Sequence, residues 1–267
     1  MAELESKILA EQEKFVSYIQ QLTTTDTLIR ADTPAKDALD EASRIRRKYD
    51  DSVARLTKLK WNQEVLKMPP IPIPEVDDFA EKFRVRHRLW DIRFTFARDQ
   101  RTWYHENFRE QDAAAIVATV KERESELVKL RAKLGRDVKD EVLEAATADV
   151  KNVSRHSALI GALGTPSMQE KHWANVWSLV ETQPSTLLNF TLHHLLQAGI
   201  DAHFERVEEI SAFAAGEATI LKTVADIASH WDETYFTVKP YRDTKDRFFI
   251  TEIDDLITQL EDDQMTV

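Results

Sequence analysis

Histidine is the commonest metal ligand in proteins, and the sequence contains eight histidines. His193 and His194 are adjacent, so their side chains would diverge by about 100° on a helix and could not bind one ion together. His203 comes more than two helical turns after His194. No Glu-x-x-His pair occurs, and no cysteine is present to supply a thiolate or a disulfide. We therefore expect no metal site.

Nucleotide chemistry would need a glycine-rich phosphate loop. The sequence contains no Gly-x-x-x-x-Gly-Lys-Ser/Thr and no Gly-x-Gly-x-x-Gly, and it also lacks His-Glu-x-x-His and Gly-x-Ser-x-Gly. Only 5 of the 267 residues are glycine, which favours long helices over barrels or sandwiches. We predict that this chain is not an enzyme by itself and that it holds no cofactor.

Two His-Trp pairs could line a ligand cleft, namely His172-Trp173 and His230-Trp231. A tryptophan at helical spacing more often packs in a core, with its indole N–H hydrogen-bonded nearby. We therefore expect both pairs to serve packing. The carboxylates between residues 254 and 263 lack the central glycine of a calcium-binding loop.

Composition limits the partners. The net charge of −11 disfavours nucleic acid, and no stretch of eighteen uncharged apolar residues could cross a membrane. With 42% hydrophobic and 31% charged residues, the chain can bury a core and still expose much charged surface. We predict a cytoplasmic protein with no nucleic-acid and no membrane partner.

Most of the histidines, tryptophans and carboxylates considered above lie in segments that we predict to be helical. Apolar side chains recur at helical spacing over residues 3–22, 35–67, 113–134, 137–160 and 201–230. Residues 35–67 keep a seven-residue rhythm, which predicts a long helix packed along a partner helix. Gly135 is a candidate C-terminal cap, and Asp201 is a candidate N-terminal cap. In the helix over 201–230, the predicted buried residues are Phe204, Val207, Ile210, Ala214, Ile220 or Leu221, Val224 and Ile227.

Proline marks the clearest boundary. Four prolines between residues 69 and 74 exclude a helix and predict an extended spacer, although a docking motif is an alternative. We predict an N-terminal helical segment at 1–68, a proline-rich spacer at 69–78 and a second helical region at 79–267. Just after the spacer, arginines crowd one predicted helix, at Arg84, Arg86, Arg88, Arg93, Arg98 and Arg101. Either they form a solvated face with local ion pairs, or they bind an acidic partner such as the acidic tail of this chain.

Near the C-terminus the hydrophobic period changes from helical to strand-like. Residues 235–239 are aromatic and β-branched, Pro240 marks a strand end, and residues 248–251 form a returning strand. A lone hairpin is marginal in water, so we expect Phe236, Val238, Phe248 and Ile250 to be buried against helices. The fold class that we predict is mainly all-α, an elongated array of antiparallel helices with one small β-hairpin at about 235–251.

The order of motifs in the last hundred residues is informative. A His-Trp pair precedes an amphipathic helix with Glu-Glu-Ile-Ser, and then come a tryptophan, an aromatic strand, Pro-Tyr-x-Asp-Thr, an apolar strand and an acidic helix. This order resembles the linker region of dynein heavy chains, more closely the axonemal than the cytoplasmic members, over residues 168–267 and more weakly over 79–164. The residues that carry it are His172, Trp173, Glu209, Ile210, Ser211, Trp231, Pro240, Tyr241, Asp243, Thr244, Asp262 and Asp263.

The resemblance implies a mechanical function. A dynein linker couples changes in the ATP-hydrolysing AAA+ ring to the tail during ciliary or flagellar movement. It implies as partners the remainder of the heavy chain and other dynein subunits, with microtubules engaged only indirectly, and a location on the axoneme and cytoskeleton. ATP would bind in the ring and not in this chain. The alternative function is a helical scaffold or adaptor without a motor.

A lever also needs a place to bend. Gly161, Gly164 and Pro166 form a candidate hinge just before the segment that carries the resemblance. Glycines permit dihedral changes that other residues resist. The proline-rich spacer is a second soft segment, and we expect the helices on either side to move as units.

Overall fold

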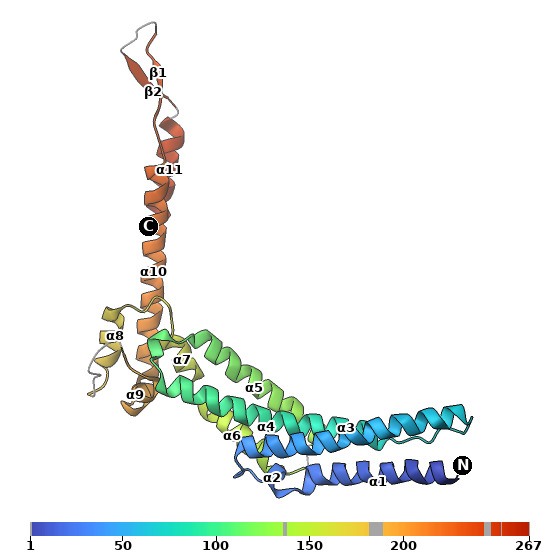
Figure 1. Ribbon diagram of the computed structural model, residues 1–267. Helices are drawn as coiled ribbons and strands as arrows, with labels where there is room; N and C mark the ends of the chain where they lie inside the picture. The colour runs from blue at the N-terminus through green and yellow to red at the C-terminus, as the bar shows by residue number, and fades with distance from the viewer. Residues whose placement is uncertain (1, 136–137, 182–188, 243–246, 252, 267) are drawn as a thin grey trace. The chain divides into compact units, whose positions relative to one another are not determined.

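The computed structural model describes residues 2–135, 138–181, 189–242, 247–251 and 253–266. Its helices and strands (Figure 1) confirm the mainly all-α fold with one hairpin near the C-terminus. The chain forms two compact units, one of Met1–Ile160 with Thr191–His193 and the other of Gly161–Phe190 with His194–Val267.

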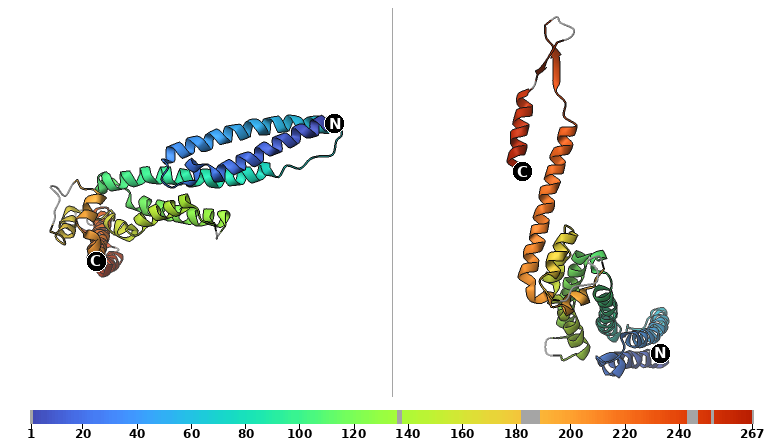
Figure 2. Two further views of the ribbon diagram at one scale, coloured as in Figure 1. Left: turned by 90° about the horizontal axis from the view of Figure 1, so that it is seen from below. Right: turned by 90° about the vertical axis from the view of Figure 1, so that its left-hand side faces the viewer.

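The core of the first unit is made by three long helices, α1 (Ala2–Thr24), α3 (Ala35–Val65) and α4 (Glu75–His105), which lie side by side (Figure 2, left). The short helix α2 (Asp26–Ile29) joins α1 to the segment before α3. The heptad pattern is confirmed, because α3 buries Ala38, Ala42, Ile45, Tyr49, Ser52, Leu56 and Gln63. Phe15, Tyr49 and Phe79 join the three helices, with ring centroids 5.5 Å apart for Phe15–Tyr49 and 4.0 Å apart for Tyr49–Phe79.

The proline-rich segment forms neither helix nor strand and links α3 to α4. Its apolar residues Met68 and Ile73 are buried, and the side-chain amide of Gln63 on α3 donates a hydrogen bond to the carbonyl of Pro69. The segment therefore packs on its neighbours within the first unit. The compact units divide at residue 160, whereas the sequence pattern placed the boundary between helical regions at residues 69–78.

Two further helices, α5 (Ala113–Leu134) and α6 (Glu141–Ser154), pack on α4 and on each other. A 3₁₀ turn at Phe108–Glu110 precedes α5. The predicted bounds of α5 are confirmed, with Asp112 capping its start and Gly135 ending it at a φ of 98°. The predicted helix at 137–160 is wrong as one element, because α6 ends at Ser154 and α7 (Ser157–Leu163) begins anew. The N–H of His156 bonds to the carbonyl of Val153, three residues back, and this tight turn separates the two helices.

The second unit is built on α10 (Phe204–Asp232), with α8 (Glu170–Trp177) packed against it. The helix α9 (Leu192–Gln197) and a 3₁₀ turn at Ile200–His203 precede α10. Asp201 lies inside this turn, so the prediction that it caps α10 is wrong; His203 has the capping position.

Among the described residues, buried side chains occur only in the first half of α10. Val207, Ser211 and Ala214 are buried, but Ile220, Leu221 and Val224 are exposed. The predicted continuous buried face of this helix is therefore wrong. An amphipathic sequence fixes which face is apolar, but not how far a neighbouring helix extends along it.

Strands β1 (Thr237–Pro240) and β2 (Phe248–Thr251) pair antiparallel, with Thr237 opposite Thr251 and Pro240 opposite Phe248. The helix α11 (Ile253–Thr266) follows, and it runs alongside α10 in Figure 2, right. The expected burial of the hairpin is wrong, since Phe236, Val238, Phe248 and Ile250 are 66%, 53%, 60% and 46% exposed. No helix of the described residues is both long and apolar enough to span a membrane.

Candidate interaction surface

Ser211 fixes the start of α10 to the end of α7. Its hydroxyl is buried and donates a hydrogen bond of 2.7 Å to the carbonyl of Ala162. The hydroxyl of Thr165 lies 2.6 Å from that of Ser211 and 2.9 Å from the same carbonyl. The carbonyls at a helix C-terminus have no partner within the helix, so these two hydroxyls satisfy a group that α7 leaves open.

The three candidate hinge residues lie at this joint. Gly161 lies inside α7 with ordinary helical backbone, Gly164 lies in the turn that follows, and Pro166 comes two residues later. The backbone N–H of Thr165 also donates to the carbonyl of Ala162, at 3.4 Å. The hinge remains a prediction, and bending there would have to break or rotate the bonds to Ser211.

His172 joins α8 to α10. Its Nδ1 accepts the backbone N–H of Gln169 at 3.1 Å, which closes a capping box at the start of α8. The ring proton of a neutral imidazole then belongs on Nε2, which lies 3.0 Å from a carboxylate oxygen of Glu217. Lys171 also bonds to Glu217, and this ammonium group holds the pKa of that carboxyl below its ordinary value. Both ring nitrogens of the buried His172 therefore have protein partners, and the residue joins α8 to α10.

Trp173 is buried against Phe190, with ring centroids 4.7 Å apart. Trp177, one turn later on α8, meets the same ring at 5.5 Å and nearly edge-on. The first His-Trp pair therefore packs in the core, as predicted. The spacing of residues in the sequence does not indicate Phe190 as the partner of both tryptophans.

Glu209 and Ile210, the other residues of the Glu-Glu-Ile-Ser motif, do not join this cluster. Glu209 is exposed and pairs with Arg206 at 2.7 Å, one turn earlier on α10. Ile210 is half-buried. Of this motif, only Ser211 contacts another segment through a side-chain hydrogen bond in the described residues.

The second His-Trp pair does not lie in a core. His230 is exposed and Trp231 is half-buried, so the predicted packing role is wrong for this pair in the form proposed. The indole N–H of Trp231 instead donates a hydrogen bond of 2.8 Å to the carboxylate of Asp263 on α11. Gln259 donates to the same carboxylate at 2.9 Å, whereas the neighbouring Asp262 is exposed. Trp231 thus connects the end of α10 to α11.

The turn of the hairpin begins at Pro240 and Tyr241. Pro240 ends β1, and the N–H of Tyr241 bonds to the carbonyl of Arg247 at 2.7 Å. The Arg242 guanidinium lies 5.2 Å from the ring centroid of Tyr241, with its backbone at a φ of 53°. Asp243 and Thr244 lie outside the described residues.

The most prominent feature of the second unit is exposed apolar surface on α10, the hairpin and α11. We call this surface the apolar arm. Its members are Ile220, Leu221, Val224, Phe236, Val238, Phe248, Phe249, Ile250, Ile253, Ile257 and Leu260. Soluble proteins rarely leave so many large apolar side chains uncovered unless the surface binds something. The apolar arm is therefore the candidate interaction surface of this chain.

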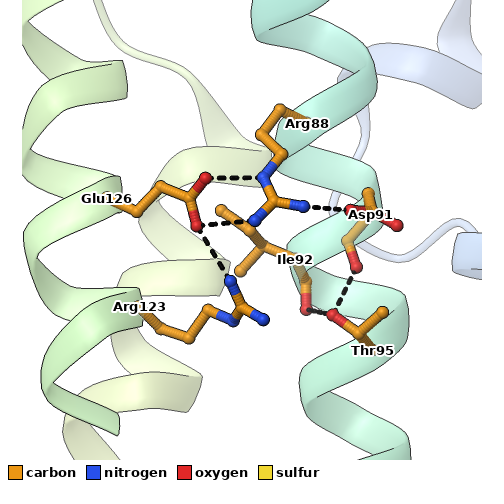
Figure 3. Close-up of polar contacts among 6 residues, drawn as sticks. All are labelled: Arg88, Asp91, Ile92, Thr95, Arg123 and Glu126. Atoms are coloured by element: carbon orange, nitrogen blue, oxygen red, sulfur yellow. Dashed lines mark hydrogen bonds and ion pairs between the residues drawn. The ribbon is translucent and has the colours of Figure 1, made fainter. Parts of the chain in front are cut away.

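Some arginines of α4 bind carboxylates on other elements, whereas Arg84, Arg98 and Arg101 are exposed. Arg86 is buried and bonds to Asp140 at 2.6 Å. Arg88 holds Glu126 of α5 through two hydrogen bonds, at 2.5 and 2.9 Å, and Arg123 bonds to the same carboxylate at 3.0 Å (Figure 3). The predicted local pairing is confirmed for Arg88 and Asp91, but the longer-range partners were not visible in the helical spacing.

Comparison with known proteins accounts for the order of motifs. The sequence matches the family described as "Dynein heavy chain, N-terminal region 2" over residues 76–267. It is 25% identical over 238 residues to human dynein axonemal heavy chain 2, and the match covers 86% of this chain and 5% of that protein. Human dynein axonemal heavy chain 6 is 23% identical over 219 residues, with 81% of this chain and 5% of that protein covered.

Human dynein axonemal heavy chain 1 is 22% identical over 239 residues, and the match covers 87% of this chain and 5% of that protein. The chain thus spans about one twentieth of the length of the curated relatives that it matches. The family match covers all of the second unit and the part of the first unit from α4 onward. The chain belongs to the dynein heavy chain N-terminal region 2 family.

Proposed function

We propose that this chain is part of the linker of a ciliary or flagellar dynein heavy chain. In this role it would transmit force between the ATP-hydrolysing ring and the tail, and ring modules outside the chain would carry out all nucleotide chemistry. The family match and the three axonemal relatives support the motor assignment over the alternative of a free scaffold.

The observation that carries the proposal is the apolar arm. In the described residues, the second half of α10, the hairpin and α11 bury no side chain, although they carry large apolar groups. A two-stranded hairpin is marginally stable by itself in water. A covering surface would stabilise it, and we propose that another part of the same heavy chain supplies that surface.

Helical construction suits this role. Side-chain contacts lock α8 to α10 through His172 and Glu217, and α7 to α10 through Ser211 and Ala162. Movement of α10 would then be passed to α7 and α8, and the candidate hinge at Gly161, Gly164 and Pro166 would bend only when the bonds to Ser211 break or rotate.

The test uses the complete heavy chain. Leu221→Glu together with Phe236→Glu should leave microtubule-independent ATP turnover intact but reduce the velocity of microtubule gliding several-fold, because the motor would be uncoupled. Lys222→Glu, an exposed residue next to Leu221, is the matched control and should leave gliding unchanged.

Hydrogen exchange provides a second readout that does not depend on activity. Amides of α11 and the hairpin should exchange much more slowly in the complete heavy chain than in the 267-residue chain. Equal exchange in both, or gliding at the normal velocity in the double variant, would contradict the proposal.

A further inference from the structure

A groove between α4 and α5 in the first unit has no role in the linker proposal. It encloses about 550 Å³, and Arg46 of α3 closes one side. A volume of this size is typical of sites that bind small molecules or short segments of chain. From the two helices its lining residues are Ala80, Phe83, Arg84, Val85, His87, Arg88, Glu126, Lys129, Leu130 and Lys133.

The charge of the groove is opposite to that of the chain. Among the described residues that line the groove, five are lysine or arginine and one carries a carboxylate, in a chain with a net charge of −11. Arg46 and Arg88 are engaged by Asp50 and by Glu126 with Asp91. Arg84, Lys129 and Lys133 are exposed and form no ion pair within the described residues. These three cations are therefore available to a partner.

The spacing of the lining follows the helices. Phe83 and His87, like Arg84 and Arg88, lie four residues apart on α4, and Glu126, Lys129 and Lys133 lie three or four residues apart on α5. The residues on α4 span about one and a half helical turns, roughly 8 Å, and those on α5 span about two turns, roughly 11 Å. The cations thus form two facing rows along a groove, unlike the convergent cluster that would hold one small anion.

The floor of the groove is apolar. Leu130 and Val85 are buried beneath it, and the half-buried ring of Phe83 stacks on Phe79 at 5.7 Å between centroids. The Arg46 guanidinium lies 5.5 Å from the centroid of the Phe83 ring. Facing rows of cations over an apolar floor complement a helix that carries carboxylates on its flanks and an apolar side chain between them.

We propose that this groove binds an acidic amphipathic helix of a partner protein. Arg84, Lys129 and Lys133 would pair with its carboxylates, and Phe83 and Leu130 would contact its apolar side chain. Because the pairs lie at the surface, they would contribute more to the rate of association and to selectivity than to affinity. Binding should accordingly weaken as salt is raised.

The test is a fluorescence anisotropy titration of the 267-residue chain against a labelled 14-residue helical peptide with glutamates flanking a leucine pair. We expect saturable binding that weakens between about 50 and 200 mM NaCl as charges become screened. The double variant Arg84→Glu with Lys129→Glu should bind at least tenfold more weakly. Lys121→Glu, also exposed on α5 but outside the groove, is the matched control and should bind as the parent chain does.

Two further measurements distinguish specific binding in the groove from a general attraction between opposite charges. The variant Phe83→Ala should weaken binding several-fold, and so should a peptide whose leucines are replaced by serine. Circular dichroism of Phe83→Ala and of the charge-reversal variants checks that each is folded. Poly-glutamate that binds as tightly as the amphipathic peptide, or a double variant that binds normally, would overturn the proposal.

Discussion

The ion pair between Arg86 and Asp140 provides a sharp test of how the first unit is held together. Their side chains are 9% and 6% exposed, and Nη2 of Arg86 lies 2.6 Å from Oδ2 of Asp140. Nη1 of Arg86 also donates to the carbonyl of Leu28, at 3.3 Å, and Oδ1 of Asp140 caps α6 by accepting the N–H of Leu143 at 3.0 Å. One arginine thereby joins α2, α4 and the start of α6.

Arg86→Leu should destabilise the first unit by about 3–5 kcal/mol, because it leaves the Asp140 carboxylate buried without its counter-charge. Asp140→Asn should cost a similar amount by leaving the guanidinium unpaired, while its amide oxygen still caps α6. The double variant should cost less than the two single variants together, since neither charge is then left alone in the interior.

The exposed pair Arg98–Asp99, with side chains 68% and 24% exposed, is the control. Arg98→Ala should cost no more than about 1 kcal/mol, since solvent and salt screen a pair of this kind. Urea unfolding followed by circular dichroism measures the cost. Hydrogen exchange in α4 and α6 locates it in the first unit.

An Arg86→Leu variant that is no more destabilised than Arg98→Ala would contradict a buried ion pair. Simple addition of the two single-variant costs in the double variant would contradict it as well, because a direct interaction requires coupling between the two sites. An unchanged denaturant slope would establish that the variants alter stability rather than the extent of unfolding.

Three further predictions concern other parts of the chain. Trp173→Ala should cost about 3–5 kcal/mol by emptying a packed site, measured by thermal unfolding, whereas Trp61→Ala, at a 64% exposed residue, should change little. Ser211→Ala should cost about 1 kcal/mol and speed hydrogen exchange in the turn after α7, and unchanged exchange there would contradict the role given to its hydroxyl. Arg88 lowers the pKa of Glu126, so this carboxylate should stabilise the fold above its ordinary pKa of about 4.5 and lose that effect as the pH falls through the lowered value. As the pH falls below about 4.5, the free energy of unfolding of Glu126→Gln should therefore decrease less steeply than that of the parent chain.

Local signals in the sequence were sufficient for much of the fold. The C-terminal end of α5 follows from Gly135, because a terminal glycine with a positive φ acts within one helical turn. The buried positions of α3 follow from its seven-residue rhythm, and the hairpin follows from the change of period after Trp231. The order of these elements also carried the family resemblance that the comparisons then established.

Local signals did not show which distant groups would meet. Nothing in the spacing of the sequence paired Asp140 with Arg86, 54 residues earlier. Glu217 and Phe190 likewise reach their partners His172 and Trp173 only through the packing of α8. Such pairings depend on the path of the chain between the two residues.

Burial on α10 and the hairpin was decided by tertiary structure alone. The sequence determines that Val207 and Val224 are both apolar, but the first is buried and the second exposed. Likewise Phe236 and Phe248 are aromatic residues of the kind that a buried hairpin would contain, but both are exposed. Apolarity is a property of a side chain, whereas burial requires a second surface to exclude water, and the described residues supply that surface only for the first half of α10.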